Sequence, residues 1–263
     1  MKLATWNVNS LKVRLPQVVQ WLTDNPVDVL CLQELKLDQP AFPQAEIEAA
    51  GYQAHWYGQK TYNGVALLVR AGARVDDVVC GIPGYADEQR RVIAATVDGV
   101  RVVCAYFVNG EAVDSPKYLY KLEWLSMMEA YVADQLSRYP AFALLGDFNI
   151  APDDRDVYDP EAWRGKVLCS DPERAAFARL IALGLSDAFR LFESGSGCYS
   201  WWDYRAAMFR RDLGVRIDHI LLSEALRQRA STCVIDKTPR RWERPSDHTP
   251  VVVALGPGME GAG

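Results

Sequence analysis

Seven segments of the chain carry the apolar runs that are typical of buried β-strands. They lie at 2–8, 27–33, 64–70, 100–107, 141–148, 215–222 and 250–255. Several runs are apolar at every position rather than at every second one, which indicates strands covered on both faces. Between them, apolar residues recur at helical spacing in three segments, 15–23, 117–136 and 172–183.

The boundaries of these segments predict how the domain is organised. Asp171 followed by Pro172 favours a helix start, and Gly184 favours its end. Strands and helices alternate throughout, and no Pro-, Ser- or Gly-rich linker divides them. We therefore expect a single α/β domain over 1–255, built from two similar halves, and a flexible tail at 256–263.

The composition excludes several classes of protein. With 49% hydrophobic and 24% charged residues among 263, the chain has too many core-forming residues to be disordered. No apolar run approaches the roughly 18 residues of a membrane span, and the segment MKLATWNVNS lacks the long apolar stretch of a signal peptide, so neither feature is expected. The six cysteines are scattered without a CxxC pair, so a structural zinc site is not expected. Reduced thiols in a cytoplasmic protein are the simplest interpretation.

The charge is unevenly distributed along the chain. The net charge of −5 argues against a nucleic-acid partner, but residues 201–250 hold ten Lys or Arg and seven Asp or Glu. The arginines of this stretch are clustered at 205–216 and at 240–244. A solvated surface and a nucleic-acid footprint both fit this pattern, so the charge alone does not decide between them.

Polar residues stand at the ends of several predicted strands. Taken singly, each is explained by turn chemistry. Side chains from several strand ends of an α/β sheet converge on one crevice, however, and carboxylate and amide oxygens are the ligands that Mg²⁺ or Mn²⁺ prefers. Such a set suits metal-assisted hydrolysis of a phosphate ester. The residues are Asn7, Gln33, Glu34, Asp147, Asn149, Asp218, Asp247 and His248.

Eight short strings in register make the resemblance specific. They are TWNVNSLK, LQELK, YNGVALL, AYFxNG, GDFNIAP, YSWWDYR, RIDHILL and SDHTPV, and they extend over nearly the whole chain. The chain thereby resembles the exonuclease III family of abasic-site endonucleases, within the superfamily that includes DNase I. The resemblance implies a four-layer α/β sandwich, in which two mostly antiparallel β-sheets pack face to face with helices outside.

The resemblance also implies a metal site and its ligands. Glu34 corresponds to the principal ligand of a Mg²⁺ ion, for which Mn²⁺ is an alternative. The residues expected to complete or support the site are Asn7, Asp147, Asn149, Asp247 and His248.

Five residues receive catalytic roles from the same resemblance. Asp147 corresponds to the group that orients and deprotonates the attacking water, and Asn149 to one that contacts the phosphate or the nucleophile. Asp218 would orient His248, whose Nε2 would face the scissile phosphate. Tyr106 matches a tyrosine that either donates a hydrogen bond to the phosphate or ionises, and the sequence leaves both open.

Candidate DNA contacts complete the set. Trp201, Val215 and Ile217 align with the family's small apolar pocket for an extruded abasic sugar, although core packing explains Val215 and Ile217 almost as well. The remaining candidates for DNA or phosphate contact are Asn63, Arg90, Arg205 and the rest of the arginine cluster that ends at Arg216. His55 and His219 are expected to be structural.

The implied function is that of a Mg²⁺-dependent DNA repair nuclease. It would cleave the phosphodiester 5′ to abasic sites and would also have 3′→5′ exonuclease, 3′-phosphatase and 3′-phosphodiesterase activity. Its partner would be double-stranded DNA with abasic sites or blocked 3′ ends, and it would act as a monomer. Two alternatives are a phosphatase or phosphodiesterase for lipid or inositol phosphates and a non-catalytic DNA-binding relative. The aromatic SWWDYR segment and the arginines favour DNA.

Overall fold

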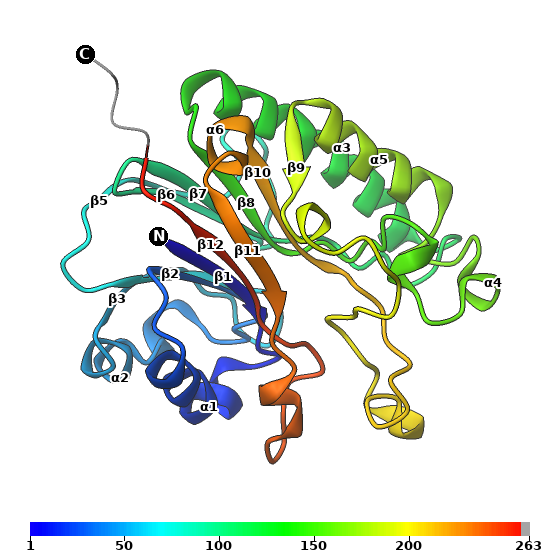
Figure 1. Ribbon diagram of the computed structural model, residues 1–263, viewed down its shortest axis with the longest axis horizontal. Coiled ribbons are helices and arrows are strands. Elements are labelled where there is room, and N and C mark those ends of the chain that lie inside the picture. Colours follow the sequence, from blue (N-terminus) through cyan, green and yellow to red (C-terminus); the bar gives the residue numbers. More distant parts are fainter. Residues whose placement is uncertain (259–263) are drawn as a thin grey trace.

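Two six-stranded β-sheets form the centre of the structure, a computed structural model that describes residues 1–258 (Figure 1). The first has the order β11 (Ala230–Ile235), β12 (Val251–Leu255), β1 (Lys2–Asn7), β2 (Val29–Gln33), β4 (Val65–Arg70), β3 (Tyr52–Tyr57). The second has the order β5 (Val75–Cys80), β6 (Val92–Val97), β7 (Val100–Tyr106), β8 (Phe142–Asp147), β10 (Asp218–Ser223), β9 (Leu185–Asp187). Among these described strands, only β1 with β2 and β7 with β8 pair in parallel.

Helices cover the outer face of each sheet (Figure 1). Helices α1 (Leu11–Asp24) and α2 (Gln44–Ala49) pack on the first sheet. Helices α3 (Pro116–Arg138) and α5 (Asp171–Ala182) pack on the second. Two short helices, α4 (Pro160–Trp163) and α6 (Glu224–Arg227), lie in connections. The expected four-layer α/β sandwich is confirmed.

The apolar runs of the central strands follow from this layering. On β2, Val29 and Cys31 face the core between the sheets, whereas Leu30 and Leu32 face the helices of the first sheet. The strand is buried along its whole length. Each central strand thus has two apolar faces, because one packs on a sheet and the other on helices.

The elements differ from the predicted ones in several ways. Helix α5 is capped by Ser170 rather than by Asp171, because the Ser170 side chain and Glu173 form a capping box. Residues 215–217 are not a strand: Val215 forms isolated bridges, and β10 begins only at Asp218. Five strands of the structure were not among the seven predicted ones: β3, β5, β6, β9 and β11.

Residue Gly256, directly after β12, is bonded to the chain beside the first sheet. Gly256 N donates to Arg229 O at 2.7 Å, so the first residue of the predicted tail is hydrogen-bonded, whereas 259–263 lie outside the described residues. Across residues 1–258, no helix combines the length and the hydropathy that crossing a bilayer requires.

Candidate active site

The polar strand ends from both sheets meet at one edge of the sandwich. Asn7 ends β1, and its Nδ2 donates to Glu34 Oε1 at 2.8 Å and to Asp147 Oδ2 at 2.9 Å. Glu34 follows β2 of the first sheet, and Asp147 ends β8 of the second. A single buried amide therefore joins carboxylates that belong to different sheets.

Local backbone geometry brings these groups together. A Cβ on Gly146 would lie 1.8 Å from Ala105 O, so only glycine lets β8 approach β7 closely enough to set Asp147 opposite Tyr106. Glu34 and Asn149 have φ values of 54° and 49°, in the left-handed region that non-glycine residues seldom occupy. Such conformations concentrate at functional sites, where the surrounding structure holds them.

The acidic groups form a candidate cation site. Ligand atoms of Glu34, Asp147 and His248 lie within 4.8 Å of one another. The pKa of Asp147 is raised to about 7, chiefly by burial and also by the neighbouring carboxylates of Asp218 and Glu34, while His248 and the hydrogen bond from Asn7 lower it. A cation here would relieve the repulsion between these carboxylates, and its ligands would be the hard oxygens that Mg²⁺ prefers. The residues present fit a divalent cation.

His248 is held as a cation by a carboxylate from the other sheet. Its Nδ1 lies 2.9 Å from Asp218 Oδ2, and its Nε2 lies 3.6 Å from Asp147 Oδ2. Burial alone would lower the pKa of this imidazole, but Asp218 and then Asp147 outweigh it and raise the pKa to about 10. Because Nδ1 faces Asp218, Nε2 is the nitrogen that lies toward Asp147, and the roles of His248 toward a phosphate and as a metal ligand both stay predictions.

Tyr106 and Asn109 add hydrogen-bond donors to the site. Burial, and then the carboxylates of Glu34 and Asp147, raise the pKa of the Tyr106 phenol well above its usual value. The phenol therefore stays protonated at neutral pH. Asn109 Nδ2 donates to Asn149 Oδ1 at 2.9 Å, and both amides line the same cleft. Our sequence prediction did not include Asn109 among the site residues, although it lies within the AYFxNG string.

Asp247 lies on the other side of the cleft. Its Oδ1 accepts a hydrogen bond from Asn9 Nδ2 at 3.0 Å, and its Oδ2 accepts one from Trp201 Nε1 at 2.9 Å. A carboxylate oxygen accepts more than one bond, so a further role as metal ligand stays a prediction.

An apolar wall faces the polar cluster across a cleft of about 530 Å³. The wall consists of Trp163, Val167, Leu168, Trp201, Met208 and Ile217. Val215, expected to line the pocket, is fully buried in a small core behind the wall because its backbone pairs with Trp201. Its alternative interpretation as a core residue is the correct one.

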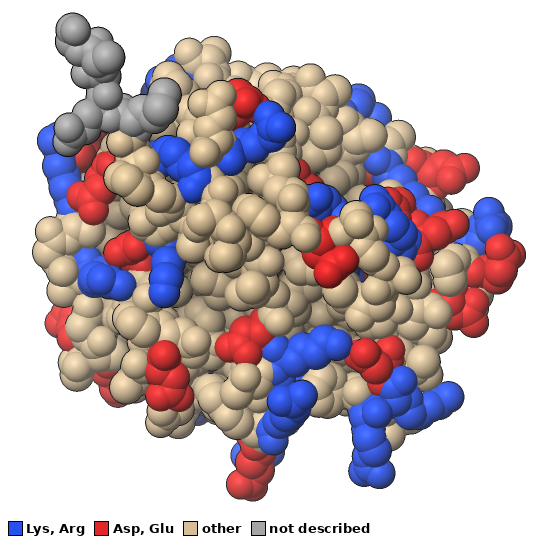
Figure 2. Space-filling view, viewed as in Figure 1, with Lys and Arg blue, Asp and Glu red and all other residues tan. Residues whose placement is uncertain are grey.

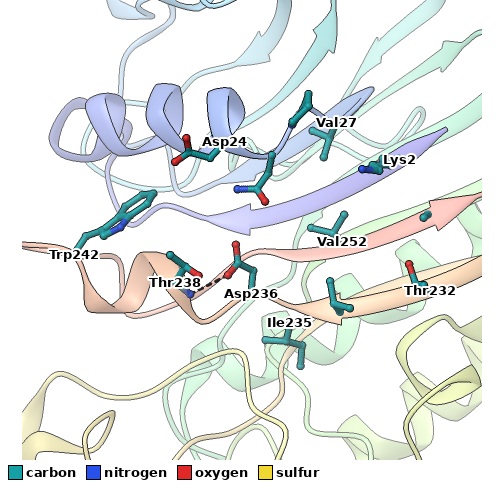
Figure 3. A pocket seen from close by; sticks show the side chains of 13 residues that line it. Lys2, Asp24, Val27, Thr232, Ile235, Asp236, Thr238, Trp242 and Val252 are labelled. Carbon is teal, nitrogen blue, oxygen red and sulfur yellow. Dashed lines mark hydrogen bonds between the residues drawn. The ribbon is translucent and has the colours of Figure 1, made fainter.

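A second hollow of about 560 Å³ lies elsewhere (Figure 3). It is formed by the end of α1 and the outer face of β11 and β12. Asp236 and Trp242 line it, and none of the polar strand-end residues do. The cluster of polar strand-end residues therefore opens into the smaller cleft and not into this hollow.

The arginine cluster divides into exposed and buried members. Arg205, Arg210 and Arg211 are exposed, and Lys and Arg side chains gather over this segment and over 238–244 along the lower edge of Figure 2. Arg216, predicted to contact phosphate, is only 1% exposed and bonds to Asp156 and to both oxygens of Asp187. That prediction is wrong, because two carboxylates occupy its guanidinium.

The Arg216 cluster predicts how stability depends on pH. Burial alone would raise the pKa of Asp156 and Asp187, but Arg216 outweighs it and holds both below the usual value. Carboxyls with lowered pKa values stabilise the fold above about pH 4 and lose that contribution as pH falls through the folded-state pKa. Asp187→Asn should lower the free energy of unfolding at pH 7 and make its decline between about pH 4 and 2 shallower.

Urea unfolding at a series of pH values measures this effect. Asp134→Asn is the matched control, because its ion pair with Arg138 is more than half exposed and contributes little. Equal slopes for Asp187→Asn and the wild type would show that the cluster is not linked to folding.

The remaining predicted residues lie outside the cleft lining. Arg90 donates to Gly58 O and lies over the Tyr57 ring, and Asn63 is buried against Gln59. Their contacts with DNA stay predictions. Burial, reinforced by Arg216, lowers the pKa of His219 to about 4, and its Nε2 bonds to Ile150 O, which agrees with a structural role.

Comparison with known proteins identifies the family. The sequence model of the endonuclease/exonuclease/phosphatase family matches residues 4–248, nearly the whole chain. The chain belongs to this family.

Individual members of the endonuclease/exonuclease/phosphatase family resemble the chain over its full length. Exodeoxyribonuclease III of Haemophilus influenzae is 33% identical over 95% of this chain and 98% of its own. A Neisseria structure described as the 3′ phosphatase NExo bound to a product DNA hairpin is 52% identical, with a TM-score of 0.95 over 97% and 99% of the two chains. An AP endonuclease from Archaeoglobus fulgidus is 34% identical, with a TM-score of 0.92 over 97% and 99%. This chain is accordingly a nuclease of the exonuclease III type.

Proposed function

We propose that the chain is a Mg²⁺-dependent DNA repair nuclease that hydrolyses phosphate esters on the 3′-oxygen of deoxyribose, both at abasic sites and at blocked 3′ ends. At an abasic site it would cut on the 5′ side and leave a 3′-hydroxyl. At a 3′ end it would remove a phosphate, a phosphodiester remnant or a nucleotide. All these reactions place a 3′-oxygen and its phosphate at one centre.

One observation carries this proposal: the carboxylate–imidazolium cluster opens directly onto an apolar wall. Trp201 and Ile217 stand on that wall, while Asp147 and His248 lie on the polar side of the same cleft. An apolar wall offers few hydrogen bonds to the edge of a base, but it packs well against a bare sugar. Extrusion of an abasic sugar costs little because no base leaves the stack.

Glu34, Asp147 and Asn7 are the residues that would hold the metal ion. Asn7 Nδ2 donates to both carboxylates, and its Oδ1 accepts from Asn9 N at 3.0 Å, which leaves a second lone pair on that oxygen for a metal. A bound divalent cation supplies a Lewis acid that offsets the charge developing on the phosphate. It would also stabilise the ionised form of Asp147.

Asp147 would accept the proton of the attacking water. Its Oδ1 accepts from Asn149 N at 3.0 Å and its Oδ2 from Asn7, so two donors fix the direction of the carboxylate. A fixed base within reach of water contributes typically 10²–10⁴-fold to the rate.

The charge on the phosphate oxygens would be met by hydrogen-bond donors of the same polar side of the cleft. The His248 imidazolium, held by Asp218, presents Nε2–H to the cleft, and the protonated Tyr106 phenol and the Asn109 amide line the same space. Preorganised donors of this kind stabilise the transition state without a cost of reorganisation.

The DNA duplex would lie along the exposed arginines at the rim of the cleft. Arg205 is 87% exposed in its side chain and lines the cleft, and Arg210 and Arg211 follow on the same loop. Contacts to phosphate position a duplex without reading its sequence. The monomeric state and the cytoplasmic location expected from the sequence stay predictions.

Incubation with three matched duplexes tests the proposed function. One carries an internal abasic analogue, one a nick with a 3′-phosphate and one a nick with a 3′-hydroxyl. We expect turnover of all three in Mg²⁺, the last through removal of 3′ nucleotides, and none in EDTA. Failure on all three, with release of phosphate from an inositol phosphate, would support the lipid- or inositol-phosphate alternative. Binding of the duplexes without turnover would support the non-catalytic one.

Trp201→Ala should weaken discrimination between abasic and intact duplex. The indole shapes the apolar wall, and its loss leaves room for a base, so we expect the ratio of abasic to intact cleavage to fall about tenfold. Removal of a 3′-phosphate needs no extruded internal sugar and should slow less. The measurement is both rates in the wild type and the variant, with Trp56→Ala as an aromatic control outside the cleft. An equal fall in both rates would mean that Trp201 only supports the core.

A further inference from the structure

A fully buried ion pair lies directly beneath the cleft. Lys121 on α3 and Glu173 on α5 are both 0% exposed, and Lys121 Nζ donates to Glu173 Oε1. The two helices are also joined at the surface by Arg179 and Glu129, so the buried pair is not needed merely to connect them. None of the proposed reaction steps uses either buried residue.

The ammonium of Lys121 is bonded to the backbone of two residues of the site. Its Nζ donates to Asn149 O at 2.7 Å and to Asn109 O at 3.0 Å. Together with Glu173, these acceptors use all three N–H groups of the ammonium. The side chains of the same two asparagines line the cleft and bond to each other. Lys121 therefore fixes, from below, the peptides whose amides face the substrate.

Glu173 completes the arrangement on its other side. Its Oε1 also accepts from Leu168 N at 3.0 Å, and its Oε2 accepts from Ser170 N at 3.1 Å and from Ser170 Oγ. Leu168 belongs to the apolar wall and has a left-handed φ of 75°. The pair thus holds three lining residues, two on the polar side of the cleft and one on the apolar side.

Stability alone does not account for a buried ion pair. Replacing such a pair by neutral groups is often neutral or stabilising, because the desolvation cost of the charges disappears with them. The Lys121 ammonium has three N–H donors, which bond to one carboxylate and two carbonyls. A neutral side chain cannot supply these three donors. Those carbonyls belong to loops that flank the reaction centre, and Asn149 adopts the left-handed backbone region.

We propose that Lys121 is a positioning residue for phosphodiester hydrolysis: it sets Asn109 and Asn149 against the scissile phosphate, with Glu173 as its counter-ion. Replacing Lys121 should lower kcat and leave duplex binding nearly unchanged. The exposed arginines that would bind the duplex are not bonded to Lys121 or Glu173 and lie far from both in the sequence. A displacement of about 1 Å at the reacting groups lowers a rate by about 10²-fold.

The test separates stability from turnover with one single and one double variant. Lys121→Met leaves the Glu173 carboxylate buried without a partner, so Tm should fall by roughly 10 °C. Lys121→Met with Glu173→Gln removes that uncompensated charge and should recover at least half of the loss. In both variants kcat should stay about 10²-fold below the wild type, with KM changed by less than about threefold. Rates are measured at a temperature at which circular dichroism shows every variant folded.

Two further variants complete the experiment. Arg179→Ala with Glu129→Ala removes the exposed pair between the same helices and should leave kcat unchanged. Lys121→Gln keeps an NH₂ donor and should give a kcat between those of Lys121→Met and the wild type. Recovery of kcat in parallel with Tm in the double variant would overturn the proposal, and so would a rise in KM at constant kcat.

The inference rests on the proposed function only for the choice of substrate. The wild-type protein is assayed on the abasic and the 3′-phosphate duplex, and the variants are compared on whichever it cleaves faster. Absence of wild-type turnover on both would count against the proposed function, whereas equal kcat in wild type and variants would count against the role of Lys121 alone.

Discussion

Asp147→Asn should lower turnover on abasic and 3′-phosphate duplexes by about 10²–10⁴-fold, the usual effect of losing a general base. The amide has the shape of the carboxylate, but its NH₂ group cannot accept, so it keeps only one of the hydrogen bonds from Asn7 and Asn149. Asparagine has no basic oxygen to accept the proton of water. Duplex binding should therefore survive while the chemical step fails.

Single-turnover rates and duplex affinity measured on the same preparation check this expectation. Asp159→Asn, which removes an exposed carboxylate at the start of α4, is the control and should retain the wild-type rate. A rate near that of the wild type for Asp147→Asn would assign the base to another group.

Glu34→Gln should lose activity by about 10²-fold or more at low Mg²⁺ and regain part of it at high Mg²⁺. The substitution removes the charge that would hold the cation while keeping the hydrogen bond from Asn7 possible. Folding should be unaffected, because the Glu34 side chain is partly exposed and its ion pair with Lys36 lies at the surface of the cleft.

Titration of activity with Mg²⁺, together with calorimetric Mg²⁺ binding and thermal unfolding, measures the three effects separately. Lys36→Gln serves as a comparison that alters the same ion pair without removing the proposed ligand. Full activity of Glu34→Gln at low Mg²⁺ would exclude Glu34 from the metal site.

Much of the fold was accessible to sequence analysis because the central strands have two apolar faces. The edge strands β5 and β11 were not predicted, because half-exposed strands such as VDDVVC and ASTCVI need no continuous apolar pattern. Strand β6 is as apolar as the strands that were predicted, so its omission reflects no physical ambiguity. The pairing of the two sheets came only from the family resemblance.

The candidate site was only partly predictable, for a similar reason. Asn7 and Asp147 end strands and Glu34 directly follows one, and their residue types are those of metal ligands. The sequence does not tell, by contrast, whether the guanidinium of an arginine contacts DNA or a buried carboxylate. Arg216 was therefore misassigned, because its partner Asp187 lies 29 residues away and meets it only through β9.

The reaction centre belongs to neither sheet alone. Asn7 reaches from the first sheet to Asp147 on the second, and Asp218 on the second sheet holds His248, which precedes β12 of the first. A half-molecule with one sheet would thus carry an incomplete set of acids and donors, however well it folded. The proposed catalytic groups are brought together only where the two sheets pack against each other. The rate of turnover should therefore depend on how accurately the two sheets are aligned.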